Sequence, residues 1–255
     1  MNTTQRTKHY LFHSWSHKHP LHRTLVKLAN RGLRTVPISL KYLFSRKIRA
    51  TRFPYALVME GNCVVQIGAP ADTLHSGRSR GMGLTLCTGS SGRSIVIEPE
   101  PRSCREFRAA ASTLGVKNVE VLNYAVTDTP QELVLRVNPL HPATNFIEGR
   151  AGYTAEEVSR FDAHPIEGRP LETLLREAGL AQTETIKVLS ITTNGAEKEI
   201  LRGATDVLPR VEHIALAGID RNLYEGFMAD LGFEFVSFDD RGITYRNTRF
   251  EGRRA

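Results

Sequence analysis

The sequence predicts an α/β domain, a mostly parallel seven-stranded sheet flanked by helices, preceded by a basic, partly helical N-terminal arm. Strand-like apolar runs alternate with helix-like segments from Cys63 onward, and strands spaced by helices imply βαβ units and a parallel sheet covered on both faces. A length of 255 residues suffices for one such domain and an appendage. We therefore divide the chain into an arm, residues 1–55, and a domain, residues 56–255.

Charge is distributed unevenly between these two parts. Residues 1–59 contain twelve Lys or Arg residues and no acidic residue, whereas the remainder contains 22 basic and 27 acidic residues, a balance of −5. The isoelectric point near 9.5 therefore reflects the arm. Because a nucleic-acid-binding domain carries its basic face on the folded part, we expect no nucleic-acid partner.

Within the arm, residues 20–34 have the pattern of an amphipathic helix, with apolar side chains on one side and basic side chains on the other. Three interpretations stay open. The apolar stripe packs on the domain, the helix lies on an anionic membrane surface, or the leader is a transit peptide. No run approaches 18 apolar residues, so no membrane-spanning helix is expected. The expected location is cytoplasmic, with or without peripheral membrane contact through the arm.

The three cysteines, Cys63, Cys87 and Cys104, lack CxxC spacing and lie in or beside predicted core elements. They are predicted to be buried thiols in a reducing compartment. The five histidines between residues 9 and 22 match no compact metal site. No metal is therefore predicted.

The first half of the domain begins with a strand at 63–69, an apolar run that ends in a glycine turn. A second strand at 94–101 leads into a helix that begins near Pro101 and closes at Gly115. A third strand is expected at 118–126.

The second half repeats the alternation. Helices are expected at 170–179, 195–204 and 221–232, strands at 185–191 and 211–219, and a closing antiparallel pair in the runs FEFVSFD and GITYRNTRF. Residues 77–92, with five glycines, and the polar stretch 141–170 are expected to be long loops. Long loops at the carboxyl edge of a sheet usually shape a substrate site.

A glycine after the first strand and an acid after the second strand indicate a cofactor. Gly68 lets the backbone approach a ligand closely, and Glu98 is placed to accept hydrogen bonds from both hydroxyls of a ribose. A dinucleotide would require GxGxxG to hold its pyrophosphate, and the residues after Ile67 read GAPAD. S-adenosylmethionine has no phosphate, so a single glycine turn and a ribose-binding acid are sufficient for it.

Three stretches, QIGAP, EPEP and SITTNGAEKEILRGA, together resemble the FkbM family of S-adenosylmethionine-dependent methyltransferases over roughly residues 60–208. In that family the corresponding stretches read Asp-x-Gly-Ala-Asn, Glu-Pro-x-Pro, and Lys-Ile-Asp-Val-Glu-Gly-Ala-Glu followed by Leu-x-Gly-Ala. The resemblance implies a class I methyltransferase (Rossmann-like) fold. It also implies methyl transfer from S-adenosylmethionine to an oxygen of a sugar, glycolipid or secondary metabolite, so that the partner is a small-molecule or glycan acceptor.

The residues expected to bind this cofactor lie at the ends of the first three strands. They are Gln66, Gly68, Ala69, Glu98 and Val126. Val126 belongs to the stretch 123–126, which is expected near the adenine by its position alone.

Five positions depart from the family pattern: Gln66, Pro70, Ser190, Thr192 and Asn194. Gln66 can hydrogen-bond the cofactor but cannot neutralise its ammonium group. Pro70 lacks a backbone N–H and has a fixed φ. We therefore expect weakened cofactor binding at Gln66 and Pro70. The turn after the strand at 185–191 is polar but uncharged.

The catalytic candidates are accordingly weak. Methyl transfer to a hydroxyl needs an aligned nucleophile and usually a group that accepts its proton. Thr192 and Asn194 can orient an acceptor but are not bases near neutral pH. Glu197 keeps the family acid, although a carboxylate one turn into a helix is also a favourable charge at the helix N-terminus.

Further candidates for a base are Asp220 at a strand end, His141 and His164 on the predicted loop, and His213, which is expected to pack within a strand or to face solvent. The loss of polar residues also supports a second hypothesis. In it the protein is a catalytically impaired member of this fold that acts as a membrane-associated or partner-binding module.

Overall fold

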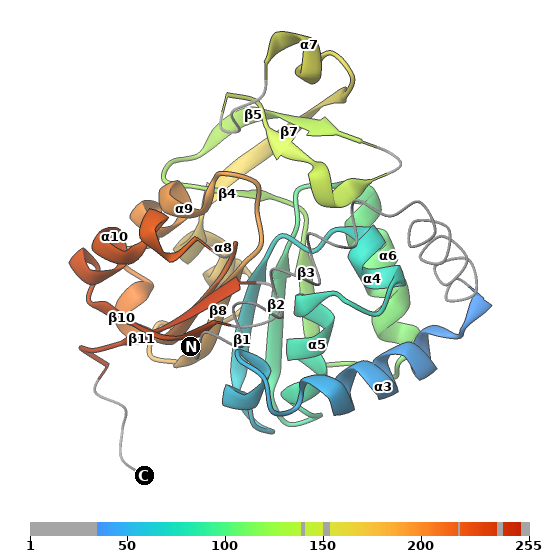
Figure 1. The fold of residues 1–255 in the computed structure, drawn as a ribbon, viewed down its shortest axis with the longest axis vertical. Coiled ribbons are helices and arrows are strands. Elements are labelled where there is room, and N and C mark those ends of the chain that lie inside the picture. The colour runs from blue at the N-terminus through green and yellow to red at the C-terminus, as the bar shows by residue number, and fades with distance from the viewer. Residues whose placement is uncertain (1–34, 139–140, 150–153, 219, 239–241, 251–255) are drawn as a thin grey trace, which may run out of the picture.

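The computed structural model describes residues 35–138, 141–149, 154–218, 220–238 and 242–250. This part of the chain forms two sheets with helices around the larger one (Figure 1). The amphipathic helix predicted at 20–34 lies outside the described residues. In the described ranges no helix is both long and apolar enough to cross a membrane.

The larger sheet has seven strands, as the sequence predicts. Their order is β10 (Phe233–Phe238), β11 (Gly242–Asn247), β9 (Val211–Ala217), β8 (Ile186–Ile191), β1 (Cys63–Ile67), β2 (Arg93–Ile97) and β3 (Val119–Leu122). The four pairs from β9 to β3 are parallel, whereas β11 is antiparallel to both of its neighbours. The antiparallel closing pair is thus confirmed, and the mostly parallel character holds in part, for four of the six strand pairs.

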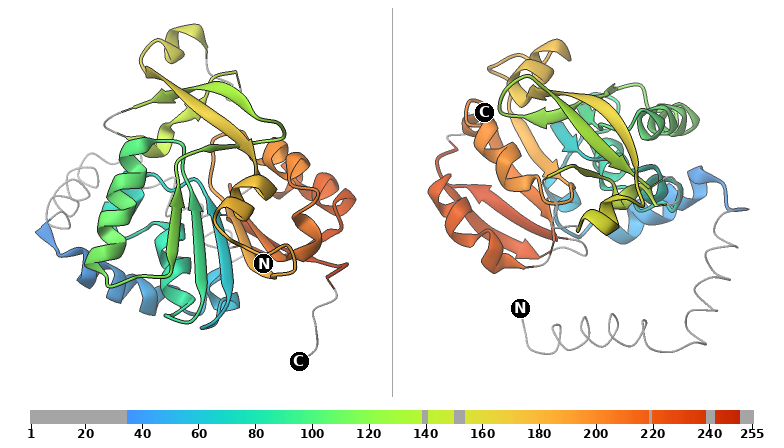
Figure 2. Two further views of the ribbon diagram at one scale, coloured as in Figure 1. Left: turned by 180° about the vertical axis from the view of Figure 1, so that it is seen from behind. Right: turned by 90° about the horizontal axis from the view of Figure 1, so that it is seen from above.

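Helices cover both faces of this sheet (Figures 1 and 2). One face carries α3 (Ile38–Arg49), α4 (Ala71–His75), α5 (Arg80–Cys87) and α6 (Pro101–Thr113). The other face carries α8 (Leu171–Glu177), α9 (Glu197–Gly203) and α10 (Glu225–Asp230). Single 3₁₀ turns connect several elements: η1 (Tyr55–Leu57), η2 (Pro142–Thr144), η3 (Leu208–Arg210) and η4 (Arg221–Leu223).

The alternation of side chains along β1 assigns each residue to one face. Val65 and Ile67 pack in the core cluster that contains the α8 and α9 residues. Val64 packs with Leu84 of α5, and Gln66 points the same way because side chains two residues apart share a face. A parallel sheet buried on both faces explains the continuous apolar run that marks β1 in the sequence.

The second sheet corrects the prediction of a long loop at 141–170. Its four strands are β4 (Ala125–Thr127), β7 (Asp162–Pro170), β5 (Gln131–Val137) and β6 (Phe146–Ile147), and a short helix α7 (Ala155–Val158) precedes β7. β7 is mostly exposed at its start, so it lacks the apolar alternation that reveals a strand. In Figure 2 this sheet caps one end of the larger sheet.

Two further predictions were wrong in part. Residues 77–92 are not a continuous loop, because α5 spans Arg80–Cys87 with Ser79 as its N-cap. The strand predicted at 118–126 is two strands, β3 and β4, which belong to different sheets. Asn123 lies between them, and its side-chain amide donates to the carbonyl oxygens of Glu98 and Pro99 at 3.0 and 2.8 Å.

The described part of the arm packs on the domain through α3. Tyr42 is buried with Leu74 and Phe107, and its hydroxyl donates to the Leu74 carbonyl oxygen at 3.1 Å. Whether residue 55 is a domain boundary remains a prediction. Of the three cysteines, Cys63 and Cys104 are buried thiols and Cys87 is partly buried.

Candidate functional site

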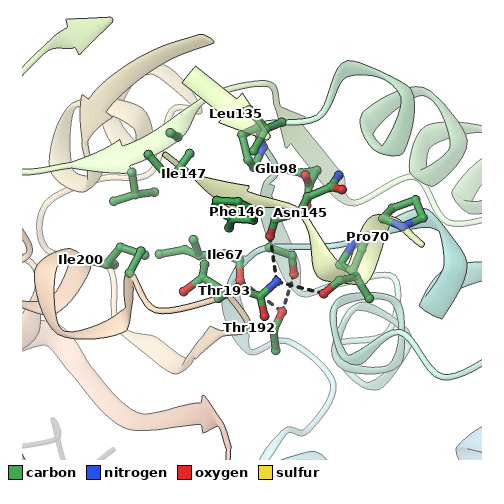
Figure 3. Close-up of a pocket in the computed structure, with 18 of the residues that line it drawn as sticks. Ile67, Pro70, Glu98, Leu135, Asn145, Phe146, Ile147, Thr192, Thr193 and Ile200 are labelled. Carbon is green, nitrogen blue, oxygen red and sulfur yellow. Dashed lines mark hydrogen bonds between the residues drawn. The ribbon is translucent and has the colours of Figure 1, made fainter. Parts of the chain in front are cut away.

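A cavity lies at the carboxyl ends of β1, β2 and β8, below the second sheet (Figure 3). Its empty space of about 630 Å³ includes volume that is open to solvent. The first strand turn contributes Ile67, Gly68 and Pro70; the second contributes Glu98 and Pro99; and Tyr124, Ala125 and Val126 follow β3. Leu135, Pro142, Ala143, Asn145, Phe146 and Ile147 cover it, and Thr192, Thr193, Asn194, Ala196 and Ile200 complete the wall.

Glu98 is the buried carboxylate of this cavity. The amide N–H of Ala69 donates to its Oε2 at 2.5 Å, and that of Glu100 donates to its Oε1 at 2.9 Å. A carboxylate has about four acceptor positions, so each oxygen retains capacity for a hydroxyl donor. The two backbone donors therefore fix the orientation of a group that can still accept hydrogen bonds from a ligand.

Burial raises the pKa of the Glu98 carboxyl to about 7. The two backbone donors oppose this rise because they favour the charged form, and the nearby Glu100 carboxylate adds to it. Glu100 is itself buried and accepts a hydrogen bond from the hydroxyl of Ser103. Ser103 in turn accepts from the amide of Ala71 at 3.0 Å, so the end of β2 is tied to the turn after β1.

The turn after β1 requires a glycine at Gly68. Its φ of +81° lies in the left-handed region, and a Cβ atom there would stand 2.3 Å from the carbonyl oxygen of Thr192. The backbones of the two strand-to-helix turns therefore touch at this point. No side chain lies between the Gly68 turn and Glu98, since Ala69 donates directly to that carboxylate.

Gln66 and Thr192 join these turns by side-chain hydrogen bonds. The Gln66 amide Nε2 donates to Thr192 Oγ1 at 2.9 Å and to the Gly68 carbonyl oxygen at 2.7 Å. The Thr192 hydroxyl donates to the same carbonyl oxygen at 2.6 Å. Gln66 Oε1 and the hydroxyl of its strand neighbour Ser190 are buried without a hydrogen-bond partner. Three of the positions that depart from the FkbM pattern, Gln66, Ser190 and Thr192, are therefore neighbours in the structure.

Asn194 and Thr193 are also used in internal contacts. The Asn194 amide Nδ2 donates to the carbonyl oxygens of Ala143 and Asn145 at 2.9 and 2.7 Å (Figure 3). Thr193 Oγ1 donates to Glu197 Oε1 at 3.0 Å. Burial raises the pKa of the Glu197 carboxyl, while N–H groups at the start of its own helix and the Thr193 hydroxyl lower it. Glu197 is therefore held at the helix N-terminus.

The structure brings most of the predicted cofactor residues together. Gly68, Glu98 and Val126 line the cavity. Ala69 faces an adjoining hollow on the other side of the turn, which it shares with Ser79 and Arg80 among others. Gln66 lines neither space and lies beneath the turn, 1% exposed. The roles of these residues in binding remain predictions.

The remaining candidate bases do not line the cavity. His141 and His164 are exposed, and His213 is packed within β9, where burial lowers the pKa of its imidazole. The Asp220 carboxylate caps η4 by accepting from the Asn222 amide at 3.0 Å. Within the described residues no group of three or more His, Cys, Asp or Glu side chains is arranged to hold a metal ion.

The sequence did not predict which apolar residues cover the cavity. Leu135 of β5 and Phe146 and Ile147 of β6 come from strands with no clear periodic signal. The Asn194 amide places these residues over the cavity, because it donates to backbone carbonyl oxygens in 143–145, directly before β6. A bond between residues about 50 positions apart cannot be read from local pattern.

The strand order, with a single reversed strand near one edge, and the helices on both faces make this a Rossmann-like α/β fold. The chain matches no family model and no curated protein sequence. Similar solved structures include a methyltransferase from Geobacter sulfurreducens, 15% identical over 95% of this chain and 97% of that chain, with a TM-score of 0.43. Another is Aeropyrum pernix fibrillarin with bound S-adenosyl-L-methionine, 13% identical over 81% and 74%, TM-score 0.43. A third is a SAM-dependent methyltransferase from Aquifex aeolicus, 12% identical over 83% and 96%, TM-score 0.40.

Proposed function

We propose that this protein binds S-adenosylmethionine and transfers its methyl group to an oxygen of a sugar, glycolipid or secondary metabolite. The observation that carries the proposal is Glu98, a buried carboxylate oriented by two backbone N–H groups beside the Gly68 turn. Glu98 opens on a cavity that has apolar side chains, among them Ile67, Val126 and Phe146, as well as polar ones. A carboxylate that accepts from both ribose hydroxyls, beside a glycine turn and apolar side chains, suits an adenosyl group.

Different side chains of the cavity are proposed to contact the ribose, the adenine and the methyl acceptor. Glu98 accepts the ribose hydroxyls, and Ile67, Val126 and Phe146 offer apolar surface to the adenine. When bound, the cofactor supplies an electrophilic sulfonium methyl group. Thr192 and Asn194, which line the cavity, are the residues proposed to orient an acceptor hydroxyl, and positioning provides most of the acceleration.

We place the protein in the FkbM family on the motif residues at 66–70, 98–101 and 190–204. A small-molecule or glycan acceptor, in preference to a nucleic acid, is supported by the acidic balance of the domain. Contact of residues 20–34 with a membrane surface remains a prediction.

A specific observation also favours the second hypothesis, a catalytically impaired module. Thr192, Asn194 and Glu197 are all engaged in internal hydrogen bonds, so no free base stands at the end of β8. In this case cofactor binding is weak or absent and the fold serves to bind a partner.

Calorimetric titration with S-adenosylmethionine and S-adenosylhomocysteine separates the two proposals. The enzyme proposal predicts micromolar dissociation constants. Glu98→Ala should weaken binding by about a hundredfold or more, because two hydrogen bonds to a charged group are lost. Glu120→Gln, an exposed acid on β3, is the matched control and should bind as the wild type does. Absence of heat with the folded wild-type protein would reject the enzyme proposal in favour of the impaired module.

A further inference from the structure

Helix α3 has two faces with opposite surroundings. Its inner face is anchored by Tyr42, 2% exposed, and by Arg49, whose guanidinium lies 5.4 Å from the centre of the Tyr55 ring. Its outer face carries large apolar side chains that remain in solvent. They are Leu40, Leu43, Phe44 and Ile48, between 44% and 61% exposed.

The outer face of α3 carries most of the large hydrophobic side chains that are exposed in the described residues. Four of the six large hydrophobic side chains that are exposed in the described part of the chain belong to this one helix of twelve residues. At 100° per residue they fall within an arc of about 140°. A contiguous apolar patch of this kind marks an interaction site.

Basic residues border and interrupt the patch. Lys41 and Arg46 flank the apolar arc on its two sides, and Lys47 lies within it. The first 59 residues contain no acid to neutralise them. The partner of this face is therefore expected to be anionic.

The position of Lys47 distinguishes a membrane from a protein partner. The buried centre of a protein–protein interface is depleted in lysine, because the ammonium group would lose its hydration. At a membrane, the lysine stem lies along the apolar surface while its ammonium group reaches the headgroups. An apolar arc with a lysine inside it thus favours a lipid surface.

The placement of α3 permits such a contact. In Figure 1 the helix runs along the outside of α5 and α6, at the margin of the molecule. Twelve residues give a helix about 18 Å long, suited to lie parallel to a surface.

We propose that the outer face of α3, formed by Leu40, Leu43, Phe44, Lys47 and Ile48, docks on an anionic membrane with its apolar side chains in the headgroup region. Attraction of Arg46 and Lys47 to anionic lipid brings the helix to the surface. The Lys41 ammonium group instead donates to the carbonyl oxygen of His75 at 2.8 Å. Burial of the apolar side chains then holds it there.

Flotation of the full-length chain with lipid vesicles tests this proposal. The vesicles contain phosphatidylcholine with about one third phosphatidylglycerol, and phosphatidylcholine alone provides the neutral comparison. The wild-type protein should float with the anionic vesicles and much less with the neutral ones. The double substitution Leu43→Ser and Phe44→Ser should lower the partition coefficient at least about tenfold, since it removes two large apolar side chains that membrane binding buries.

Leu223→Ser is the matched control, because Leu223 is 58% exposed on η4, and it should float as the wild type does. Equal flotation of the wild type and the double variant would overturn the proposal, as would absence of wild-type binding to anionic vesicles. A wild-type dimer that the double variant abolishes, with no vesicle binding, would instead assign this face to a second copy of the chain. Unchanged thermal transitions of the two variants verify that they fold.

Discussion

Two strand-to-helix turns meet at the same edge of the sheet but use their polar groups differently. After β2, Glu98 receives two backbone N–H donors and keeps acceptor capacity on both oxygens. After β8, the side chains of Thr192 and Asn194 donate to backbone carbonyl oxygens. The first turn presents a titratable group to a ligand, whereas the second turn holds the chain in place. This difference supports the proposed role of Glu98 in holding a cofactor and gives Thr192 and Asn194 a structural role.

The largest effect is expected at Gly68, where the two turns touch. Gly68→Ala places a Cβ atom 2.3 Å from the Thr192 carbonyl oxygen at a φ of +81°. We expect a loss of at least about 3 kcal/mol in the free energy of unfolding, from strain and steric overlap together. Urea unfolding monitored by circular dichroism measures this loss.

Gly115→Ala provides the control for that experiment. Gly115 has a φ of +70° and open space around its Cβ position, so its substitution should cost only about 1 to 2 kcal/mol. Equal losses in the two variants would show that contact between the turns does not matter.

Titration of Glu98 should have the next largest effect. Its pKa of about 7 in the folded protein exceeds the ordinary value of 4.5, so the folded state binds more protons than the unfolded state between these values. Stability from this group is therefore full below about pH 4.5 and is lost as pH rises through about 7, by about 3 kcal/mol at most.

The measurement is the difference in unfolding free energy between wild type and Glu98→Gln at several pH values. The wild type should lose stability relative to the variant over this window, because the amide does not ionise. A difference that is constant with pH would contradict a raised pKa at Glu98.

Asn194 tests the scaffold role of the second turn, with the smallest expected effect. Asn194→Ala removes two hydrogen bonds to the 143–145 backbone and should cost about 1 kcal/mol, because this side chain is exposed. Hydrogen exchange at residues 143–147 should accelerate. Gln182→Ala, an exposed amide before the other end of β8, should leave that exchange unchanged. Protection that is equal in both variants would remove Asn194 from this role.

The sequence predicted the larger sheet well because its signals are local. The runs that form β1, β2 and β8 are rich in apolar residues, are largely buried and end in turns, and Pro101 marks the start of α6. The pairing of Gly68 with Glu98 follows from the adjacency of β1 and β2.

The failures have identifiable physical causes. Gly81 and Gly83 lie within α5 and made its sequence resemble a loop. Close packing explains why glycine occurs at both positions. A Cβ atom at Gly81 would lie 2.9 Å from Gln66, and one at Gly83 would lie 2.7 Å from Tyr55. These glycines are required by neighbours distant in sequence, so local propensity misjudges them. The cover of the cavity was missed for the same reason, since Asn194 holds it across a long sequence separation.

The most direct test is a crystal structure of the complex with S-adenosylhomocysteine. The account predicts both ribose hydroxyls within about 3.2 Å of the Glu98 carboxylate oxygens, with the adenine between Val126 and the cover formed by Phe146 and Ile147. An adenosyl group bound elsewhere, or a Glu98 carboxylate that contacts only Ala69 and Glu100 in the complex, would contradict it.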